Sequence, residues 1–193
     1  RRGQRQGRMS RLDINIRRLE AQRACLGLAA RLIHDLAGPV FELGLGNGRT
    51  YDHLREVCPG REIFVFEREV AAHPDCVPGE AHLLLGDFRD TLPQAAQRFR
   101  HKVAFIHAEF GTANPECDRK LAAFIAEQLP LLLAPGGLIA ADRDVAFQGS
   151  ATVALPDRFD DGAYFLYRAG PAVAQAQPAL GATAPDPALG AAD

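Results

Sequence analysis

A glycine-rich segment carries the clearest chemical pattern in the chain. Glycines alternate at Gly44, Gly46 and Gly48, and Glu42 stands just before them in the apolar stretch 40–43. Alternating glycines let the backbone turn sharply and allow a ligand to lie directly on the main chain. A helix is expected to begin soon after Gly48, and the free amide groups at its start favour a negatively charged group. The segment therefore predicts a ligand-binding loop at the carboxyl end of a strand.

The glycine spacing distinguishes two kinds of nucleotide-binding sheet. A dinucleotide fingerprint requires G-x-G-x-x-G, which places the third glycine at position 49 or 51, depending on the frame. These positions hold Arg49 and Tyr51. A nicotinamide-dependent oxidoreductase on a related sheet is therefore kept only as an alternative, and these two residues disfavour it.

Two acids follow the next two apolar stretches. Glu67 lies nineteen positions after Gly48, where a carboxylate can accept hydrogen bonds from two ribose hydroxyls. The alternative for Glu67 is a surface ion pair with Arg68. Asp87 could accept from the exocyclic amine of adenine, with Phe88 offering apolar surface to the ring. Asp87 could also cap the following helix, and both roles are compatible.

These residues require a parallel sheet to bring them together. Apolar stretches alternate with helix signals, which indicates strands joined by right-handed crossovers. A capped helix is predicted to open at Asn114-Pro115 and to run to about Leu129, where Pro130 kinks or ends it. We predict a doubly wound, mostly parallel, Rossmann-like α/β sheet of about seven strands. The expected strands cover residues 40–43, 63–66, 82–85, 103–106 and 138–141, then 152–155 and 163–167; a helix is expected over 50–57 and a turn over 135–137.

A long helix is predicted before the first strand. Ser10-x-x-Asp13 is a helix-start signature, and Gly38-Pro39 stops the helix. Gln22 and Arg23 interrupt its apolar face. That face is formed by Leu12, Ile16, Leu19, Leu26, Ala30 and Ile33, whereas Arg11, Arg17, Arg18 and Arg23 are interpreted as a solvated basic face rather than a recruitment surface.

The composition is that of one globular domain. The 193 residues are 47% hydrophobic and 24% charged, with a net charge of −2, which gives no reason to expect a nucleic-acid partner. We expect a basic arm over 1–9, disordered or derived from upstream of Met9, a folded domain over 10–169 and a disordered Ala/Pro-rich tail over 170–193. No apolar stretch is of the membrane-spanning or signal-peptide kind.

The cysteines are scattered and form no C-x-x-C pair. A reducing compartment, the cytoplasm, is therefore expected. His73, Cys76 and His82 lack a second close pair of ligands, so no metal site is predicted.

The residues from Glu42 to Gly48 resemble the E-x-G-x-G-x-G signature of class I S-adenosylmethionine-dependent methyltransferases. Glu67, Asp87 and the runs 107–109 and 133–137 fall where the later motifs of that family lie. The runs 9–13 and 44–55 are similar to a small bacterial family called S-adenosyl-L-methionine methyltransferase. Together these similarities cover roughly residues 10–168.

This resemblance implies the class I methyltransferase fold, with S-adenosylmethionine as cofactor and S-adenosylhomocysteine as product. It also implies a set of cofactor-binding residues. They are Glu42, Gly44, Leu45, Gly46, Asn47, Gly48, Thr50, Glu67, Asp87, Phe88 and His107.

Methyl transfer mainly requires an aligned nucleophile, and a base if that nucleophile is protonated. Candidate bases stand at the ends of the fourth and fifth predicted strands: His107 and Glu109, then Asp142 and Asp144. His107 is the first choice because its ordinary pKa is near neutrality, although a structural histidine is an equal alternative. Glu109 could instead bind a substrate amine. Glu109 and Asp142 complete the predicted catalytic set.

The chain has no recognisable substrate domain and no basic, aromatic-rich stripe, so a small-molecule substrate is expected. Either the first helix or the second subunit of a homodimer could cover the pocket. A cofactor-binding protein without catalysis is the remaining alternative, favoured if His107, Glu109 and Asp142 all point away from the pocket.

Overall fold

A computed structural model describes residues 9–112, 114–156, 159, 162 and 164–171, and all structural statements refer to these. Seven strands form one sheet in the order β3-β2-β1-β4-β5-β7-β6. The first five pair in parallel, whereas β7 runs antiparallel to both β5 and β6. The strands are β1 (Val40–Leu43), β2 (Ile63–Glu67), β3 (Leu83–Leu85), β4 (Val103–Ala108), β5 (Leu133–Ala141), β6 (Ser150–Thr152) and β7 (Phe165–Ala169).

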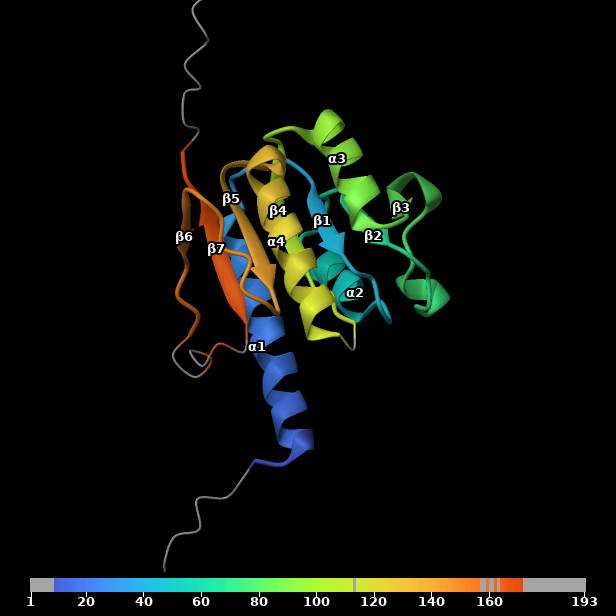
Figure 1. Cartoon of the computed structure of the whole chain (residues 1–193), viewed down its shortest axis with the longest axis vertical. Coiled ribbons are helices and arrows are strands. Elements are labelled where there is room, and N and C mark those ends of the chain that lie inside the picture. Colours follow the sequence, from blue (N-terminus) through green and yellow to red (C-terminus); the bar gives the residue numbers. More distant parts are fainter. Residues whose placement is uncertain (1–8, 113, 157–158, 160–161, 163, 172–193) are drawn as a thin grey trace, which may run out of the picture.

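Helices cover both faces of this sheet, as the alternation of strands and helices predicted (Figure 1). One apolar core lies between the sheet and helices α3 and α4, and a second lies between the sheet and helices α1 and α2. The doubly wound α/β prediction is therefore confirmed. The helices are α1 (Arg11–Leu32), α2 (Arg49–Val57), α3 (Phe88–Phe99) and α4 (Pro115–Leu132), with short 3-10 turns η1 (Pro74–Cys76) and η2 (Glu80–His82).

Strand β1 shows why the central strands lack polar alternation. Phe41 and Leu43 enter the core under α3 and α4, whereas Val40 enters the core under α1 and α2. Successive side chains point to opposite faces, and both faces are covered. Glu42 shares the second face with Val40 and is fully buried there.

Helix α1 begins as predicted but is only partly packed. The Asp13 amide donates to Ser10 Oγ at 3.0 Å, and the Asp13 carboxylate accepts from the Ser10 amide at 3.3 Å, which completes a capping box. The predicted apolar face is wrong in its first half, because Leu12 is 68% exposed and Ile16 is 47% exposed. This part of the helix projects beyond the sheet, whereas Leu26 is buried against it (Figure 1).

The C-terminal end of α1 is tied down by one side chain. Arg61, just before β2, donates from Nη1 to the carbonyls of Leu36 and Gly38 at 2.7 and 2.9 Å. Its Nη2 donates to the carbonyls of Ile33 and His34 at 2.6 and 3.1 Å. Arg61 thereby supplies partners for carbonyl groups at and beyond the helix end.

Some predicted boundaries differ from the structure. Helix α4 continues through Pro130 to Leu132 instead of ending near Leu129. The predicted turn at 135–137 lies within β5, where the pairing register with β4 shifts between Val103 and Phe105. Strand β6 covers Ser150–Thr152, earlier than the predicted 152–155. Ala163, most of the predicted arm and most of the predicted tail lie outside the described residues.

Candidate active site

The glycine loop leaves β1 at the carboxyl edge of the sheet, where the strand order reverses between β1 and β4. The Gly44 amide donates to the Phe66 carbonyl at 2.9 Å, and the Glu109 amide donates to the Leu43 carbonyl at 3.0 Å. Gly44 has a φ of +94°, and a Cβ there would overlap the Glu109 carbonyl oxygen. Only glycine fits this junction between the loop and the end of β4.

Gly46 and Gly48 serve different purposes in the same loop. A Cβ on Gly46 would meet no atom within 4 Å, so this residue faces open space. Gly48 stands at the N-cap of α2 with a φ of +83°, and as a glycine it offers no side chain of its own to cap the helix. Asn47 Oδ1 accepts a hydrogen bond from the Arg49 amide at 3.3 Å and supports the turn from the glycine loop into α2. The loop and the helix start therefore present backbone to a cleft.

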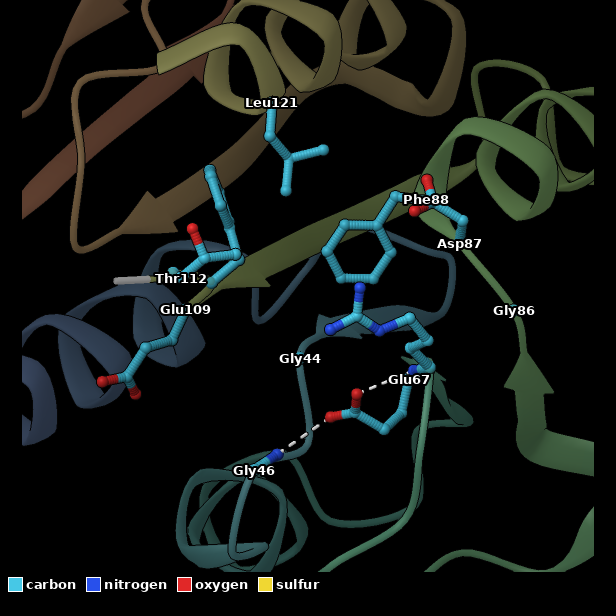
Figure 2. A pocket seen from close by; sticks show the side chains of 12 residues that line it. Gly44, Gly46, Glu67, Gly86, Asp87, Phe88, Glu109, Thr112 and Leu121 are labelled. Carbon is cyan, nitrogen blue, oxygen red and sulfur yellow. Dashed lines mark hydrogen bonds between the residues drawn. The ribbon is translucent and has the colours of Figure 1, made fainter. Parts of the chain in front are cut away.

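Two adjoining cavities form this cleft, and Figure 2 shows the residues that line the first. The first cavity has a volume of about 230 Å³ and reaches Glu67, Asp87 and Phe88. The second cavity has a volume of about 330 Å³ and reaches Thr50 and Asp142. Both are lined by Gly44, Gly46, Glu109, Phe110 and Gly111.

Glu67 turns its carboxylate toward the glycine loop (Figure 2). Oε2 accepts from the amides of Leu45 and Gly46 at 2.8 and 3.0 Å. Oε1 accepts from the Arg68 amide at 2.7 Å, so this contact with Arg68 runs through its backbone. Asp87 Oδ1 accepts from the Arg89 amide at 2.9 Å and caps α3 while it also lines the first cavity.

Glu42 and His107 lie below the cleft and line neither of these two cavities. They are neighbours in the parallel pairing of β1 and β4, which places both side chains on one face. Glu42 Oε2 lies 2.6 Å from His107 Nδ1, and both side chains are fully buried. His107 Nε2 bonds to the Tyr164 hydroxyl, and Thr50 Oγ1 donates to Glu42 Oε1. The ring of His107 is therefore buried below the cleft with a partner at each nitrogen, and its role as base stays a prediction.

The proton positions in this group follow from counting donors. Gln22 Nε2 donates to Tyr164 at 3.3 Å, so the Tyr164 hydroxyl can donate to His107 Nε2. His107 Nδ1–H then donates to Glu42. Burial lowers the pKa of His107, but the Glu42 carboxylate outweighs it and raises the pKa. A second ring proton would nevertheless leave the hydroxyl without an acceptor among these residues, so we assign the singly protonated ring.

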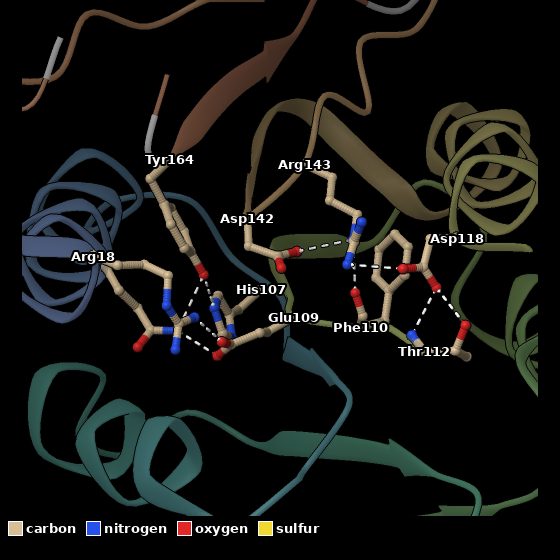
Figure 3. A network of polar contacts seen from close by, with 10 residues as sticks. Arg18, His107, Glu109, Phe110, Thr112, Asp118, Asp142, Arg143 and Tyr164 are labelled. Carbon is tan, nitrogen blue, oxygen red and sulfur yellow. Dashed lines mark hydrogen bonds and ion pairs between the residues drawn. The ribbon is translucent and has the colours of Figure 1, made fainter. Parts of the chain in front are cut away.

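Glu109 lines both cavities and is held from α1 (Figure 3). Its Oε1 forms an ion pair with Arg18, and its Oε2 accepts from Gln22 Nε2 at 2.5 Å. Burial raises the pKa of Glu109, but the hydrogen bonds from Arg18 and Gln22 outweigh it and lower the pKa. Glu109 is therefore an ionised group and a weak proton acceptor.

Asp142 follows β5 and lines the second cavity. Its Oδ1 is buried and accepts no hydrogen bond from any described residue; Arg143 Nε lies 3.8 Å away. Burial raises the pKa of Asp142 to about 6. Asp144, two residues on, accepts from the Tyr167 hydroxyl at 2.7 Å.

Arg143 lies between Asp142 and the segment that follows β4, and it contacts both (Figure 3). Its Nη2 lies 3.1 Å from Asp118 Oδ2, and its Nε donates to the Phe110 carbonyl at 2.8 Å. Asp118 is buried and accepts from the amide and hydroxyl of Thr112 at 2.7 and 3.0 Å. This pair fixes the segment after β4 that lines both cavities.

The sequence pattern does not reveal several of these residues. Arg18 belongs to the predicted solvated face, but in the structure it holds Glu109. Gln22 carried a usable signal, since a polar residue inside an apolar stripe needs a buried partner. Tyr164, Asp118 and Arg143 lie far along the chain from their partners, and no local pattern marked them.

The strand order and the glycine loop at its reversal point define a class I S-adenosylmethionine-dependent methyltransferase. Sequence comparison agrees: a model of the family described as S-adenosyl-L-methionine methyltransferase matches residues 9–169. The chain belongs to this family, and S-adenosylmethionine is its cofactor. None of the curated proteins compared with the chain matches it significantly.

Solved structures support the same assignment. An S-adenosyl-L-methionine methyl transferase from Silicibacter pomeroyi DSS-3 is 47% identical, with a TM-score of 0.79; the match covers 84% of this chain and all of that one. Two others share the fold alone. A protein-(glutamine-N5) methyltransferase from Alicyclobacillus acidocaldarius is 15% identical, with a TM-score of 0.51, over 78% of this chain and 93% of that one. MycE of the mycinamycin biosynthetic pathway, in complex with Mg, SAH and mycinamycin VI, is 13% identical, with a TM-score of 0.52. That match covers 82% of this chain and 49% of MycE.

The family and the glycine spacing remove the oxidoreductase alternative. The condition favouring a protein without catalysis is not met either, because Glu109 and Asp142 line the cleft. Within the described residues there is no group of three or more His, Cys, Asp or Glu side chains that could hold a metal ion. The described helices include none that is long and apolar enough to cross a membrane.

Proposed function

We propose that this enzyme methylates a small molecule bound in the second cavity. The observation that carries the proposal is the pair of adjoining cavities around one glycine loop. The second has a volume of about 330 Å³, within the usual size of small-molecule sites, and it shares five lining residues with the first. One cavity can hold a nucleoside while its neighbour receives an acceptor.

The residues around the first cavity fit the cofactor. Gly46 lines both cavities and the start of α2 borders the second, so the amino-acid end of the cofactor would extend from the first cavity into part of the second, with its carboxylate near the free amides. Glu67 would accept from ribose hydroxyls, and Asp87 with Phe88 would bind adenine. Glu42, Thr50 and His107 would act from below by supporting the loop. When bound, the cofactor supplies a methyl carbon activated by a positively charged sulfur.

Asp142 replaces His107 as the preferred base. A base needs a free acceptor atom in the cavity and a pKa near the working pH. The Asp142 side chain lines the second cavity and is 18% exposed, with its buried Oδ1 3.8 Å from Arg143 Nε, and burial raises its pKa to about 6. His107 has both nitrogens occupied, and Glu109 is held ionised by Arg18 and Gln22.

Two measurements test this proposal. Thermal shift with S-adenosylhomocysteine, S-adenosylmethionine and NAD should show stabilisation by the first two, about 2.7 kcal/mol at 100 times the dissociation constant. A screen of small amines, acids and phenols, read by S-adenosylhomocysteine release, should then find an acceptor that gains one methyl group. Methylation of a protein or RNA fraction, with no small molecule modified, would contradict the proposed substrate class.

A further inference from the structure

We propose that Arg143 is a positioning residue of the cofactor site, on which it acts through the segment 110–112. This inference rests on the proposed placement of the cofactor's nucleoside in the first cavity, and it adds a residue that the glycine-loop signature does not include. It is carried by the contacts of one guanidinium group and by a glycine that leaves room for that group.

The guanidinium group of Arg143 joins the end of β5 to two other elements (Figure 3). Its Nε donates to the carbonyl of Phe110, after β4, at 2.8 Å, and its Nη2 lies 3.1 Å from Asp118 Oδ2 in α4. Its central carbon also lies 5.7 Å from the centroid of the Phe110 ring. A planar group with fixed N–H directions makes these contacts at the same time, whereas the ammonium group of a lysine is a single point charge.

Gly111 leaves the space that this arrangement needs. A Cβ at position 111 would lie 2.5 Å from Arg143 Nη2 and 3.7 Å from Asp118 Oδ2. Gly111 does not have a positive φ, so the backbone itself accepts an alanine there. A methyl group at position 111 would therefore displace the guanidinium group of Arg143 rather than strain the chain.

Asp118 anchors the far side of the guanidinium group. Its side chain is 4% exposed, and its Oδ1 accepts from the amide and hydroxyl of Thr112 at 2.7 and 3.0 Å. The hydrogen bonds from Thr112 and the charge of Arg143 lower the pKa of Asp118, so this carboxylate is ionised. Arg143 thus holds the segment 110–112 directly at Phe110 and, through Asp118, at Thr112.

The segment held in this way forms one wall of the first cavity. Phe110, Gly111 and Thr112 line that cavity together with Phe88. The rings of Phe88 and Phe110 meet edge to face, with their centroids 6.5 Å apart and an interplanar angle of 86°, a favoured geometry for aromatic pairs. A shift of Phe110 would therefore disturb Phe88, the residue proposed to contact adenine. Arg143 borders the second cavity and not the first, so its effect on the nucleoside passes through Phe110.

Two ligands separate this indirect role from a direct contact with the cofactor. S-adenosylhomocysteine is the whole product, whereas 5′-methylthioadenosine keeps the nucleoside and the thioether but lacks the amino-acid end. Calorimetry would measure the affinity of both ligands for the wild type, Arg143→Lys, Gly111→Ala and the double variant, and the melting temperature of each protein would be recorded. Gly79→Ala is the matched control, because Gly79 has a φ of −62° and a Cβ there would meet no atom within 4 Å.

We expect Gly111→Ala to weaken both ligands by the same factor, about 3- to 30-fold, within the range of couplings between residues in contact. Gly79→Ala should change neither affinity. Arg143→Lys should weaken both ligands to a similar extent while its melting temperature stays within about 4 °C of the wild type, because lysine keeps the charge beside Asp118 but cannot also bond to Phe110. In the double variant, Gly111→Ala should add less than about a two-fold loss, since the atom that its methyl group displaces is gone.

Three results would overturn the proposal. Wild-type affinity of Arg143→Lys for both ligands would reduce Arg143 to an ion-pair partner of Asp118. Weaker binding of S-adenosylhomocysteine alone would assign Arg143 to the amino-acid end of the cofactor. Equal losses from Gly111→Ala in the wild type and in Arg143→Lys would show that the methyl group does not act through Arg143.

Glu67→Ala distinguishes failure of this inference from failure of the proposed function. If Glu67→Ala leaves both affinities unchanged, the placement of the nucleoside in the first cavity is wrong, and this inference falls with it. If Glu67→Ala weakens both ligands but Gly111→Ala and Arg143→Lys do not, the placement stands and only the role of Arg143 is refuted. Should Arg143→Lys fail to fold, the comparison of Gly111→Ala with Gly79→Ala decides alone.

Discussion

Replacement of Asp142 by asparagine should raise the stability of the fold and lower the turnover of the enzyme. Burial raises the folded-state pKa of this carboxyl from 3.8 to about 6, so the folded protein binds its proton more tightly than the unfolded chain does. The ionised carboxylate therefore costs folding free energy above pH 6, and this cost disappears as the pH falls toward 3.8. Asp142→Asn removes the charge and, with it, the pH-dependent cost.

The size of this effect follows from the pKa shift. A shift of about two units corresponds to about 3 kcal/mol at 1.36 kcal/mol per unit. The Asp142 side chain is 18% exposed, and screening by solvent reduces the expected gain in folding free energy to about 2 kcal/mol. For a chain of this size, that gain corresponds to a rise in melting temperature of about 4–8 °C. If Asp142 is the base, turnover should fall about 10²- to 10⁴-fold.

The assay is denaturant unfolding at pH 8 and at pH 4.5, together with turnover on an acceptor from the screen. Asp142→Asn should be more stable than the wild type at pH 8, and the difference should shrink at pH 4.5. Asp35→Asn is the control, because that carboxylate is 98% exposed and remote from the cleft. A variant no more stable than the wild type at pH 8 would refute the burial argument. Wild-type turnover would refute the catalytic role.

Three further predictions concern the cofactor and the buried network. Glu67→Ala should weaken S-adenosylhomocysteine binding by about 1–3 kcal/mol in calorimetry, and unchanged affinity would remove Glu67 from the cofactor site. Gly46→Ala and Gly60→Ala both place a side chain at positive φ with no atom within 4 Å, so each should lose about 1 kcal/mol of stability. Only Gly46→Ala should also lower cofactor affinity, and equal affinities would show that the loop is not the binding surface. His107→Ala should lower the free energy of unfolding in urea by about 3 kcal/mol, since it leaves Glu42 buried without its partner. A fully stable His107→Ala protein would contradict the structural role.

The fold could be predicted because its signals are local. Apolar stretches bounded by glycine and proline identified the core strands, and Ser10 identified the first helix to within one residue. Boundaries failed where tertiary contacts decided them. Helix α4 extends past Pro130 although a proline removes one hydrogen bond and crowds the carbonyl four residues before it, because Leu132 is buried in the core. The exposed Leu12 shows that an apolar period does not reveal where the supporting sheet ends.

The candidate site could be predicted only as far as the ends of the strands. Parallel strands finish at one edge, so Glu67, Asp87, Glu109 and Asp142 were correctly expected to reach one cleft. His107 could not be placed correctly, because one position along a strand decides whether a side chain enters the core or the cleft. Its partner Tyr164 comes from a segment 57 residues further on, and no periodicity connects the two.

With His107 singly protonated as assigned above, the hydrogen bonds from Gln22 through Tyr164 and His107 to Glu42 all run in one direction, each donor facing the next acceptor. The four residues of such a chain depend on one another. If one of them is replaced by an apolar residue, its neighbours are left buried without hydrogen-bond partners. If all four are replaced by apolar residues of similar volume, the loss of folding free energy can be small. Among relatives, these four positions should therefore change together or not at all. Glu67 accepts hydrogen bonds from the backbone amides of Leu45 and Gly46, which every sequence provides. A change at Glu67 therefore does not require a change at any of these four positions.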